Sequence, residues 1–125
     1  MRRIYEYDVF RLSHKLAIEI YKITKSFPRE EIFGLTSQMR RSAYSIPMNL
    51  VEGASRKSSK EFAHFIDIAI GSCEEVRYQL FLSKDLTYIN VMELKQMDGE
   101  YEKVKMMLTK LAKRIAVGGK RIADQ

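Results

Sequence analysis

Apolar residues recur every three or four positions along most of this chain of 125 residues, which is the spacing of a stripe on one face of an α-helix. The pattern is most informative from Gly34 to Ser58, where the stripe consists of Leu35, Met39, Ala43, Ile46 and Leu50. Pro47 lies inside this stripe, and because it lacks a backbone N–H it would kink an isolated helix at a cost of about 3 kcal/mol. We therefore expect a bundle helix that neighbouring helices hold in place.

The same period predicts four helices in all, over residues 8–26, 29–55, 59–86 and 91–117. Residues of the kinds that begin and end helices mark these ranges. In chain order they are Asp8, Pro28, Ser58 with Glu61, Asn90 with Glu93, and Gly118 with Gly119. After the two glycines, residues 120–125 are expected to form a loose basic tail.

The connections between these helices are short, and the chain has only two prolines and six glycines. Short connections join helices that lie beside one another and run in opposite directions. The sequence therefore predicts an all-α fold, an antiparallel up-down-up-down four-helix bundle, as a single domain over residues 1–125. No linker, internal repeat or low-complexity tract interrupts it.

Two of the helices carry more apolar surface than one core face requires. The first has a second apolar side, formed by Phe10, Ala17, Ile18 and Tyr21 with His14 among them. The third has apolar residues spread around its circumference, namely Ile68, Ile70, Tyr78, Phe81 and Leu82. Either a wide face within one chain or burial against another subunit accounts for this excess.

The chain is basic, with 22 Lys and Arg against 16 Asp and Glu, a formal charge of +6 and a pI near 9.5. A basic surface favours contact with polyanions such as nucleic acid. The candidate contacts are Arg2, Arg3, Arg11, Lys15, Arg40, Arg56, Lys57, Lys60, Lys113 and Arg114. Arg40, Arg56 and Lys57 are expected to meet phosphates near the turn between the second and third helices.

A second interpretation of the charge needs no ligand, because surface helices normally carry Lys and Arg that pair with Glu. Lys103 and Lys105, which lie among Glu100 and Glu102, fit this interpretation better. The basic charge would then serve solubility alone.

No constellation of residues indicates catalysis, and we expect neither an enzyme nor a cofactor or metal site. Glu61-x-x-His64 resembles half of a di-iron carboxylate site, but a four-helix bundle needs a second copy, and the sequence has none. Cys73 lies in an apolar stripe, which does not suit a nucleophile. A single cysteine and an N-terminus without an apolar signal segment favour the cytoplasm, with no membrane association.

Four segments of the chain match one known family at matching spacing. They are Phe27-Pro28, Gly34-Leu35-x-x-Gln38-x-x-Arg41, Ser45-Ile46-Pro47-x-Asn49-x-x-Glu52-Gly53 and Ala69-x-Gly71-Ser72-x-x-Glu75. The chain resembles the four-helix-bundle proteins encoded in intervening sequences of bacterial large-subunit ribosomal RNA genes. The resemblance runs from about Tyr7 to Ile115, although Cys73 stands where the family more usually has an aliphatic residue.

This resemblance implies a homopentameric barrel with no established enzymatic activity. The same fold is similar to the accessory protein of diversity-generating retroelements, a basic pentamer that binds nucleic acid and its reverse transcriptase. The expected partners are therefore further copies of the chain, RNA or DNA, and a reverse transcriptase. The alternative is a structural or protein-binding oligomer with no nucleic-acid role.

The residues that the family motif marks are interpreted as structural. They are Arg41, Pro47, Asn49, Glu52, Gly53, Gly71, Ser72 and Glu75. Arg41 is expected to form a partly buried ion pair with Glu52 or Glu75, since either charge buried alone would be costly. Asn49 is expected to bond backbone groups freed by Pro47, with a ligand contact as the alternative. Small residues near Gly71 predict a close approach of two helices.

Overall fold

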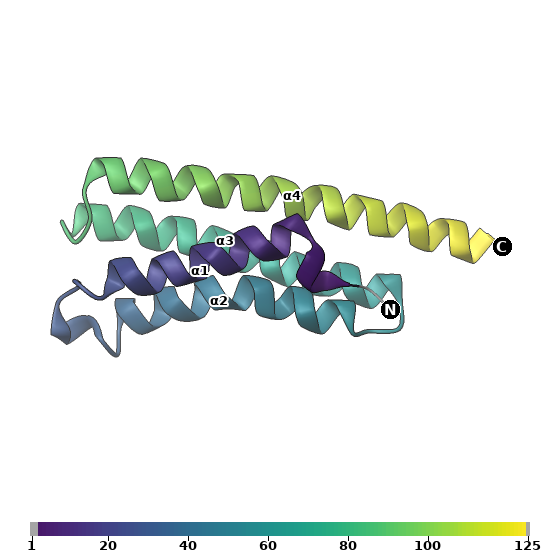
Figure 1. Cartoon of the computed structure of the whole chain (residues 1–125), viewed down its shortest axis with the longest axis horizontal. Helices are drawn as coiled ribbons and strands as arrows, with labels where there is room; N and C mark the ends of the chain where they lie inside the picture. The colour runs from purple at the N-terminus through teal and green to yellow at the C-terminus, as the bar shows by residue number, and fades with distance from the viewer. Residues whose placement is uncertain (1–2, 125) are drawn as a thin grey trace.

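A computed structural model describes the backbone of residues 3–124 and the side chains of residues 3–118. Over this range the chain forms four α-helices and no strand, which confirms the predicted all-α class. The α-helices are α1 (Asp8–Thr24), α2 (Leu35–Ala54), α3 (Ser59–Asp85) and α4 (Val91–Asp124), with short 3-10 helices at Ile4–Glu6 and Arg29–Glu31. Successive helices are joined at alternating ends, and the two chain ends lie at the same end as the α2–α3 connection (Figure 1).

Two predicted helix starts are wrong. Asp8 is the first residue of α1, and the cap position belongs to Tyr7, which has extended backbone and no side-chain cap bond. The second helix begins at Leu35 instead of residue 29, because Gly34 has a non-helical backbone (φ −117°, ψ −116°) that separates it from the 3-10 helix. Glu31 bridges this break, since its Oε1 accepts the backbone N–H of Leu35 (3.3 Å).

Helix α2 continues through Pro47 without interruption. Because proline has no N–H, the carbonyl of Ala43 loses its usual partner one turn earlier. Asn49 does not replace that bond, contrary to our prediction: its Nδ2 donates to the carbonyl oxygen of Ser45 (2.7 Å) and to Ser45 Oγ (2.9 Å). Ser45 Oγ also lies 2.8 Å from Ser72 Oγ on α3. Asn49 and Ser72 therefore join the helix after the proline to its neighbour.

Both predicted capping pairs are present at the starts of α3 and α4. The Glu61 N–H donates to Ser58 Oγ (3.1 Å), and the second pair is reciprocal, with Glu93 N–H to Asn90 Oδ1 (2.8 Å) and Asn90 N–H to Glu93 Oε1 (3.0 Å). The predicted end of the last helix is wrong, because α4 passes Gly118 and reaches Asp124. Residues 120–124 are therefore helical and not a loose tail.

The core lies between the four helices and follows the predicted stripes. Its largest fully buried side chains come from every helix, namely Ile20, Met39, Ile46, Leu50, Phe62, Ile66, Leu80, Tyr101 and Leu108. Burying a side chain of this size is worth roughly 1.5–3 kcal/mol before conformational entropy is subtracted. This continuous core holds α2 in its helical form across Pro47.

The close approach of α2 and α3 occurs at Gly53 and not at Gly71. A Cβ on Gly53 would lie 2.7 Å from the Cβ of Phe65 and 2.9 Å from Cδ1 of Phe62. Gly71 is exposed, and a Cβ there would meet nothing within 4 Å. The small residues that face the core are its neighbours Ala69, Ser72 and Cys73.

The predicted ion pair of Arg41 is also wrong. Arg41, Glu52 and Glu75 are exposed, and among the described residues no ion pair joins them. Glu75 instead accepts a hydrogen bond from Ser42 Oγ (3.2 Å). The partly buried arginine is Arg77 of α3.

Arg77 connects α3 to α4 through two carboxylates. Its Nε lies 2.8 Å from Asp98 Oδ1 and its Nη1 lies 3.1 Å from Glu74 Oε1. The hydrogen bond to Asp98, followed by that to Glu74, raises the already high pKa of the guanidinium. The pattern of the sequence gave no sign that Arg77, among 22 basic residues, would fill this role.

Candidate functional site

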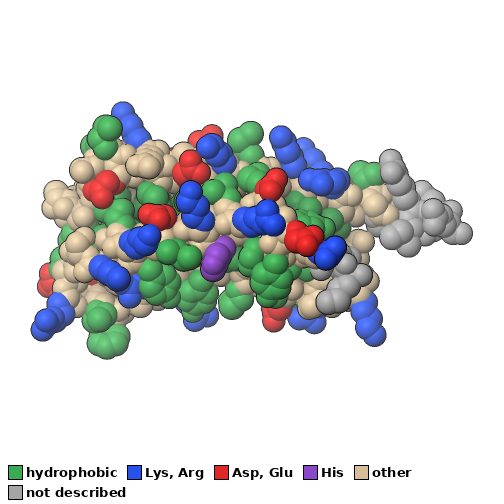
Figure 2. Space-filling model, viewed as in Figure 1, with side chains coloured by type: hydrophobic (Ala, Val, Ile, Leu, Met, Phe, Trp, Pro, Cys, Tyr) green, Lys and Arg blue, Asp and Glu red, His purple; other side chains and the backbone are tan. Residues whose placement is uncertain are grey.

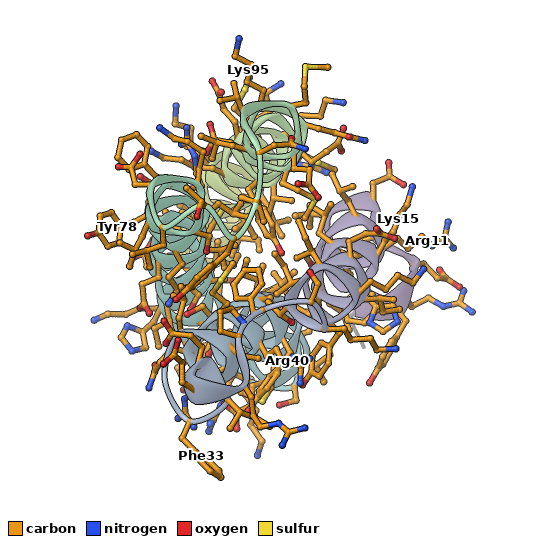
Figure 3. All side chains as sticks on the ribbon, turned by 90° about the vertical axis from the view of Figure 1, so that its left-hand side faces the viewer. Arg11, Lys15, Phe33, Arg40, Tyr78 and Lys95 are labelled. Carbon is orange, nitrogen blue, oxygen red and sulfur yellow. The ribbon has the colours of Figure 1, made fainter. Side chains whose placement is uncertain are left out.

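The candidate basic residues gather mainly at one end of the bundle, where α1 begins, α2 turns into α3 and α4 ends (Figure 1). We call this the basic end. Its exposed basic residues are Arg3, Arg11, Arg56, Lys57, Lys60, Lys110, Lys113 and Arg114. Lys15 lies one turn further along α1, and Figure 3 shows it projecting from the bundle with Arg11. Arg2 lies outside the described residues. The fold thus brings together cations from three separate segments.

Several cations of the basic end have no intramolecular charge partner. Among the described side chains, no ion pair within 4.0 Å involves Lys57, Lys60 or Lys113. Arg3 is paired with Glu6 (3.5 Å), and the guanidinium of Arg56 lies 4.9 Å from the ring centre of Phe65. An unpaired surface cation is free to approach an anion without first breaking an existing contact.

Arg40 does not belong to the basic end, contrary to our prediction. It lies near the other end of α2, and sixteen residues at about 1.5 Å each place it about 24 Å along the chain from Arg56. Its Nε donates to Thr24 Oγ1 (2.9 Å), its Nη2 donates to the carbonyl of Tyr21 (3.4 Å), and its guanidinium lies over the Tyr21 ring. Arg40 therefore completes the C-terminal end of α1, where cations are favoured.

Lys103 and Lys105 follow the interpretation that needs no ligand. Lys103 Nζ lies 3.2 Å from Glu100 Oε1, and Lys105 Nζ lies 3.3 Å from Glu74 Oε1 on α3. These pairs neutralise part of the charge in the middle of α4. The unpaired charge is concentrated further along the helix.

A second candidate surface is an apolar face that runs along α1 and α2. It consists of Tyr5, Phe10, His14, Ile18, Tyr21, Tyr44 and Met48, and we call it the α1–α2 face. Tyr5 packs edge-on against Phe10, and the His14 ring is stacked on Phe10. Ile18 and Met48 are 45% and 53% exposed. Figure 2 shows hydrophobic side chains gathered over these two helices.

An apolar pocket extends the α1–α2 face toward the basic end. It has a volume of about 580 Å³ and is lined by Arg3, Ile4, Tyr5, Glu6, Val51, Ala54 and Ser55. It lies between the first 3-10 helix and the end of α2. Together the face and the pocket form one apolar surface on this side of the molecule.

A third surface, the α3–α4 face, lies on the other side of the bundle. Tyr78 and Phe81, which are 63% and 52% exposed, line a pocket of about 470 Å³ with Leu94 and Lys95. Figure 3 shows Tyr78 projecting from α3 on the side away from α1. The two apolar surfaces that the sequence left open are thus exposed, and they differ from each other in residue content.

The buried polar side chains offer no reactive group. Cys73 is fully buried, and its Sγ donates to the carbonyl of Tyr101 (3.1 Å). Burial raises the pKa of the Cys73 thiol to about 12, so the nucleophilic thiolate is disfavoured. Burial likewise raises the pKa of the Tyr101 hydroxyl. Both groups belong to the packed core.

Neither a metal cluster nor a membrane-spanning helix occurs in the part of the chain that the structure describes. No group of three or more His, Cys, Asp or Glu side chains there is arranged to hold a metal ion. His64 is exposed beside Phe65, and Glu61 serves the start of α3. No helix within the described range is long and apolar enough to cross a membrane.

Comparisons with known proteins give a family and a fold. The family model described as 23S rRNA-intervening sequence protein matches residues 5–110. A crystal structure of a protein with unknown function from the S23 ribosomal protein family of Bacteroides thetaiotaomicron is similar, with a TM-score of 0.75 and 24% sequence identity. The similarity covers 84% of this chain and 98% of that one. A comparison with curated proteins gives no match.

Proposed function

The chain belongs to the 23S rRNA-intervening sequence protein family, and from that premise we propose that it acts as a homo-oligomer that binds nucleic acid through its basic end. The proposal includes no catalytic step. Its protomer is a bundle whose neighbouring helices run antiparallel. A reverse transcriptase as a further partner stays a prediction from the resemblance in sequence.

The unpaired cations of the basic end carry the nucleic-acid part of the proposal. Lys57 and Lys60 come from the α2–α3 turn and Lys113 from α4, so three exposed charges meet at one end of the molecule. Each cation that neutralises a phosphate releases condensed counterions, and this release drives binding. A polyanion gains from such a cluster, whereas a neutral or cationic partner does not.

The two apolar faces support an oligomer. Monomeric proteins rarely expose large contiguous apolar patches, and burying such patches between copies removes them from water. Because the α1–α2 face and the α3–α4 face differ in composition, one face of a copy meets the other face of the next copy. Contacts of this heterologous kind close into rings. The number of five copies rests on the family resemblance, and such a ring would carry a formal charge of about +30.

The test is a titration of fluorescently labelled RNA and duplex DNA over a series of salt concentrations. Phosphate contacts make the logarithm of the affinity fall linearly with the logarithm of salt concentration. A variant with Lys57→Gln, Lys60→Gln and Lys113→Gln should bind more weakly than wild type. A control with Lys25→Gln, Arg29→Gln and Lys95→Gln removes the same charge from the opposite end.

The outcomes separate the proposal from its alternative. If both triple variants bind equally, net charge and not the basic end determines binding. If the wild-type protein binds neither nucleic acid at low salt, the chain is a structural or protein-binding oligomer whose charge serves solubility.

A further inference from the structure

The last part of α4 differs from the rest of the basic end in its charge pattern. From Lys103 to Ala123 the sequence contains seven Lys and Arg and no Asp or Glu. By contrast, the α2–α3 turn is flanked by Glu52 and Glu61. The positive potential along the end of α4 is therefore the least offset by neighbouring carboxylates on its own element.

The packing of α4 points these charges away from the core. Tyr101, Val104, Leu108 and Leu111 are buried, which fixes one side of the helix against the bundle. Lys110, Lys113 and Arg114 lie on the exposed side, and within the described residues none of them forms an ion pair. Figure 1 shows α4 extending past the α2–α3 connection, so this side is open to a partner.

We infer that Lys110, Lys113 and Arg114 form the principal phosphate contact of this protein, and that this contact does not depend on nucleic-acid sequence. The inference rests on the proposed nucleic-acid binding and assigns it to one element. Lys and Arg neutralise phosphates, but on this side of α4 no described Asn, Gln or Ser is present to read base edges. The hydroxyl of Thr109 is engaged by the carbonyl of Lys105 (2.9 Å).

A lipid surface fits the same charges less well. Helices that lie on membranes bury a broad apolar side among the lipids. The apolar side of α4 is already buried in the bundle, and its exposed large apolar residues near these cations are only Met106 and Val117. Phosphates of a nucleic acid therefore suit this surface better than an anionic membrane does.

Two carboxylates from the start of α1 oppose the site. Glu6 and Asp8 line a pocket of about 340 Å³ together with Lys110 and Arg114. Glu6 is paired with Arg3, whereas Asp8 forms no ion pair within the described residues. Its negative charge lowers the local potential, so Asp8→Asn should strengthen binding of nucleic acid.

The experiment compares three variants in the salt titration with two unrelated duplex DNA sequences and one RNA. The α4 variant carries Lys110→Gln, Lys113→Gln and Arg114→Gln, and the turn variant carries Arg11→Gln, Lys57→Gln and Lys60→Gln. We expect the α4 variant to bind about tenfold more weakly or worse and to reduce the salt slope by up to about 0.9 per lost duplex contact. The turn variant should lose less, and a Lys110→Arg, Lys113→Arg variant should bind like wild type.

Each outcome decides the inference. If wild type binds and the α4 variant keeps the wild-type affinity and slope, the assignment to α4 is wrong while the proposed function stands. A strong preference for one duplex would contradict sequence independence. Binding to phosphatidylglycerol vesicles in preference to nucleic acid, lost in the α4 variant, would make the site a lipid contact. If wild type binds no nucleic acid, the proposed function itself fails.

Discussion

At the scale of single residues, the sequence predicted burial well and partners poorly. The spacing of apolar residues identified core positions such as Met39, Ile46 and Leu108, which are fully buried. Arg40 and Arg41 are adjacent in sequence, yet Arg40 completes the end of α1 and Arg41 is exposed. A partner is determined by which side chains meet in three dimensions, and periodicity along one helix does not contain that information.

The two glycines of the family motif should respond in opposite ways to alanine. Gly53→Ala places a methyl group against Phe62 and Phe65, and we expect it to lower the free energy of unfolding by roughly 1–3 kcal/mol. Gly71→Ala meets open space in a helix and should raise the free energy by roughly 0.5–1 kcal/mol. Urea unfolding followed by circular dichroism measures both; equal effects would contradict the described contact between α2 and α3.

The thiol of Cys73 should be inert in the native protein. Burial raises its pKa from 9.0 to about 12, so the reactive thiolate forms only at high pH or after unfolding. Because the folded pKa is the higher one, the stability from the buried neutral thiol is complete below pH 9 and is lost as the pH rises toward 12. Alkylation by iodoacetamide at pH 8, followed by mass spectrometry, should be slow without urea and rapid in denaturing urea. Rapid native labelling would show that Cys73 is accessible.

At the scale of elements, the existence and order of the helices were predictable, while several ends were not. The capping pairs Ser58–Glu61 and Asn90–Glu93 are local in sequence, so spacing alone revealed them. The start of α2 depends on the backbone of Gly34 and on Glu31, and the end of α4 passes glycines that adopt helical conformation. Glycine permits a helix to stop but does not require it.

The ion-pair network between α3 and α4 gives a prediction for Arg77. Arg77→Ala removes the hydrogen bonds to Asp98 and Glu74, and we expect a loss of roughly 1–2 kcal/mol in the free energy of unfolding. Arg41→Ala is the matched control, because Arg41 is an exposed arginine on the neighbouring helix and should change stability by under roughly 0.5 kcal/mol. Thermal unfolding at two salt concentrations measures both variants, and the Arg77 effect should shrink at high salt.

At the scale of the whole molecule, the sequence predicted excess apolar surface and basic charge but not their arrangement. The α1–α2 face and the α3–α4 face lie on different sides of the bundle (Figure 3), and the unpaired cations gather at one end. These relations depend on how the helices surround the core. Only the folded chain therefore separates a surface for further copies from a surface for polyanions.

The heterologous contact between the two faces predicts the behaviour of mixed variants. Ile18→Glu with Met48→Glu should disable the α1–α2 face, and Tyr78→Glu with Phe81→Glu should disable the α3–α4 face. Each variant alone should be monomeric with unchanged helix content, since these side chains are exposed. A mixture should form a dimer of the two, because each retains one intact face. Light scattering after gel filtration measures the masses, with Met92→Glu as a control at an exposed residue outside both faces.

Sedimentation equilibrium of the wild-type chain at micromolar concentration tests the central claim most directly, namely that copies assemble and pool their positive charge. One chain has a mass of 14.6 kDa. The account predicts a single species whose mass is a multiple of this value, with five copies expected from the family resemblance. A stably folded species of 14.6 kDa, with both apolar faces exposed to water, would contradict it.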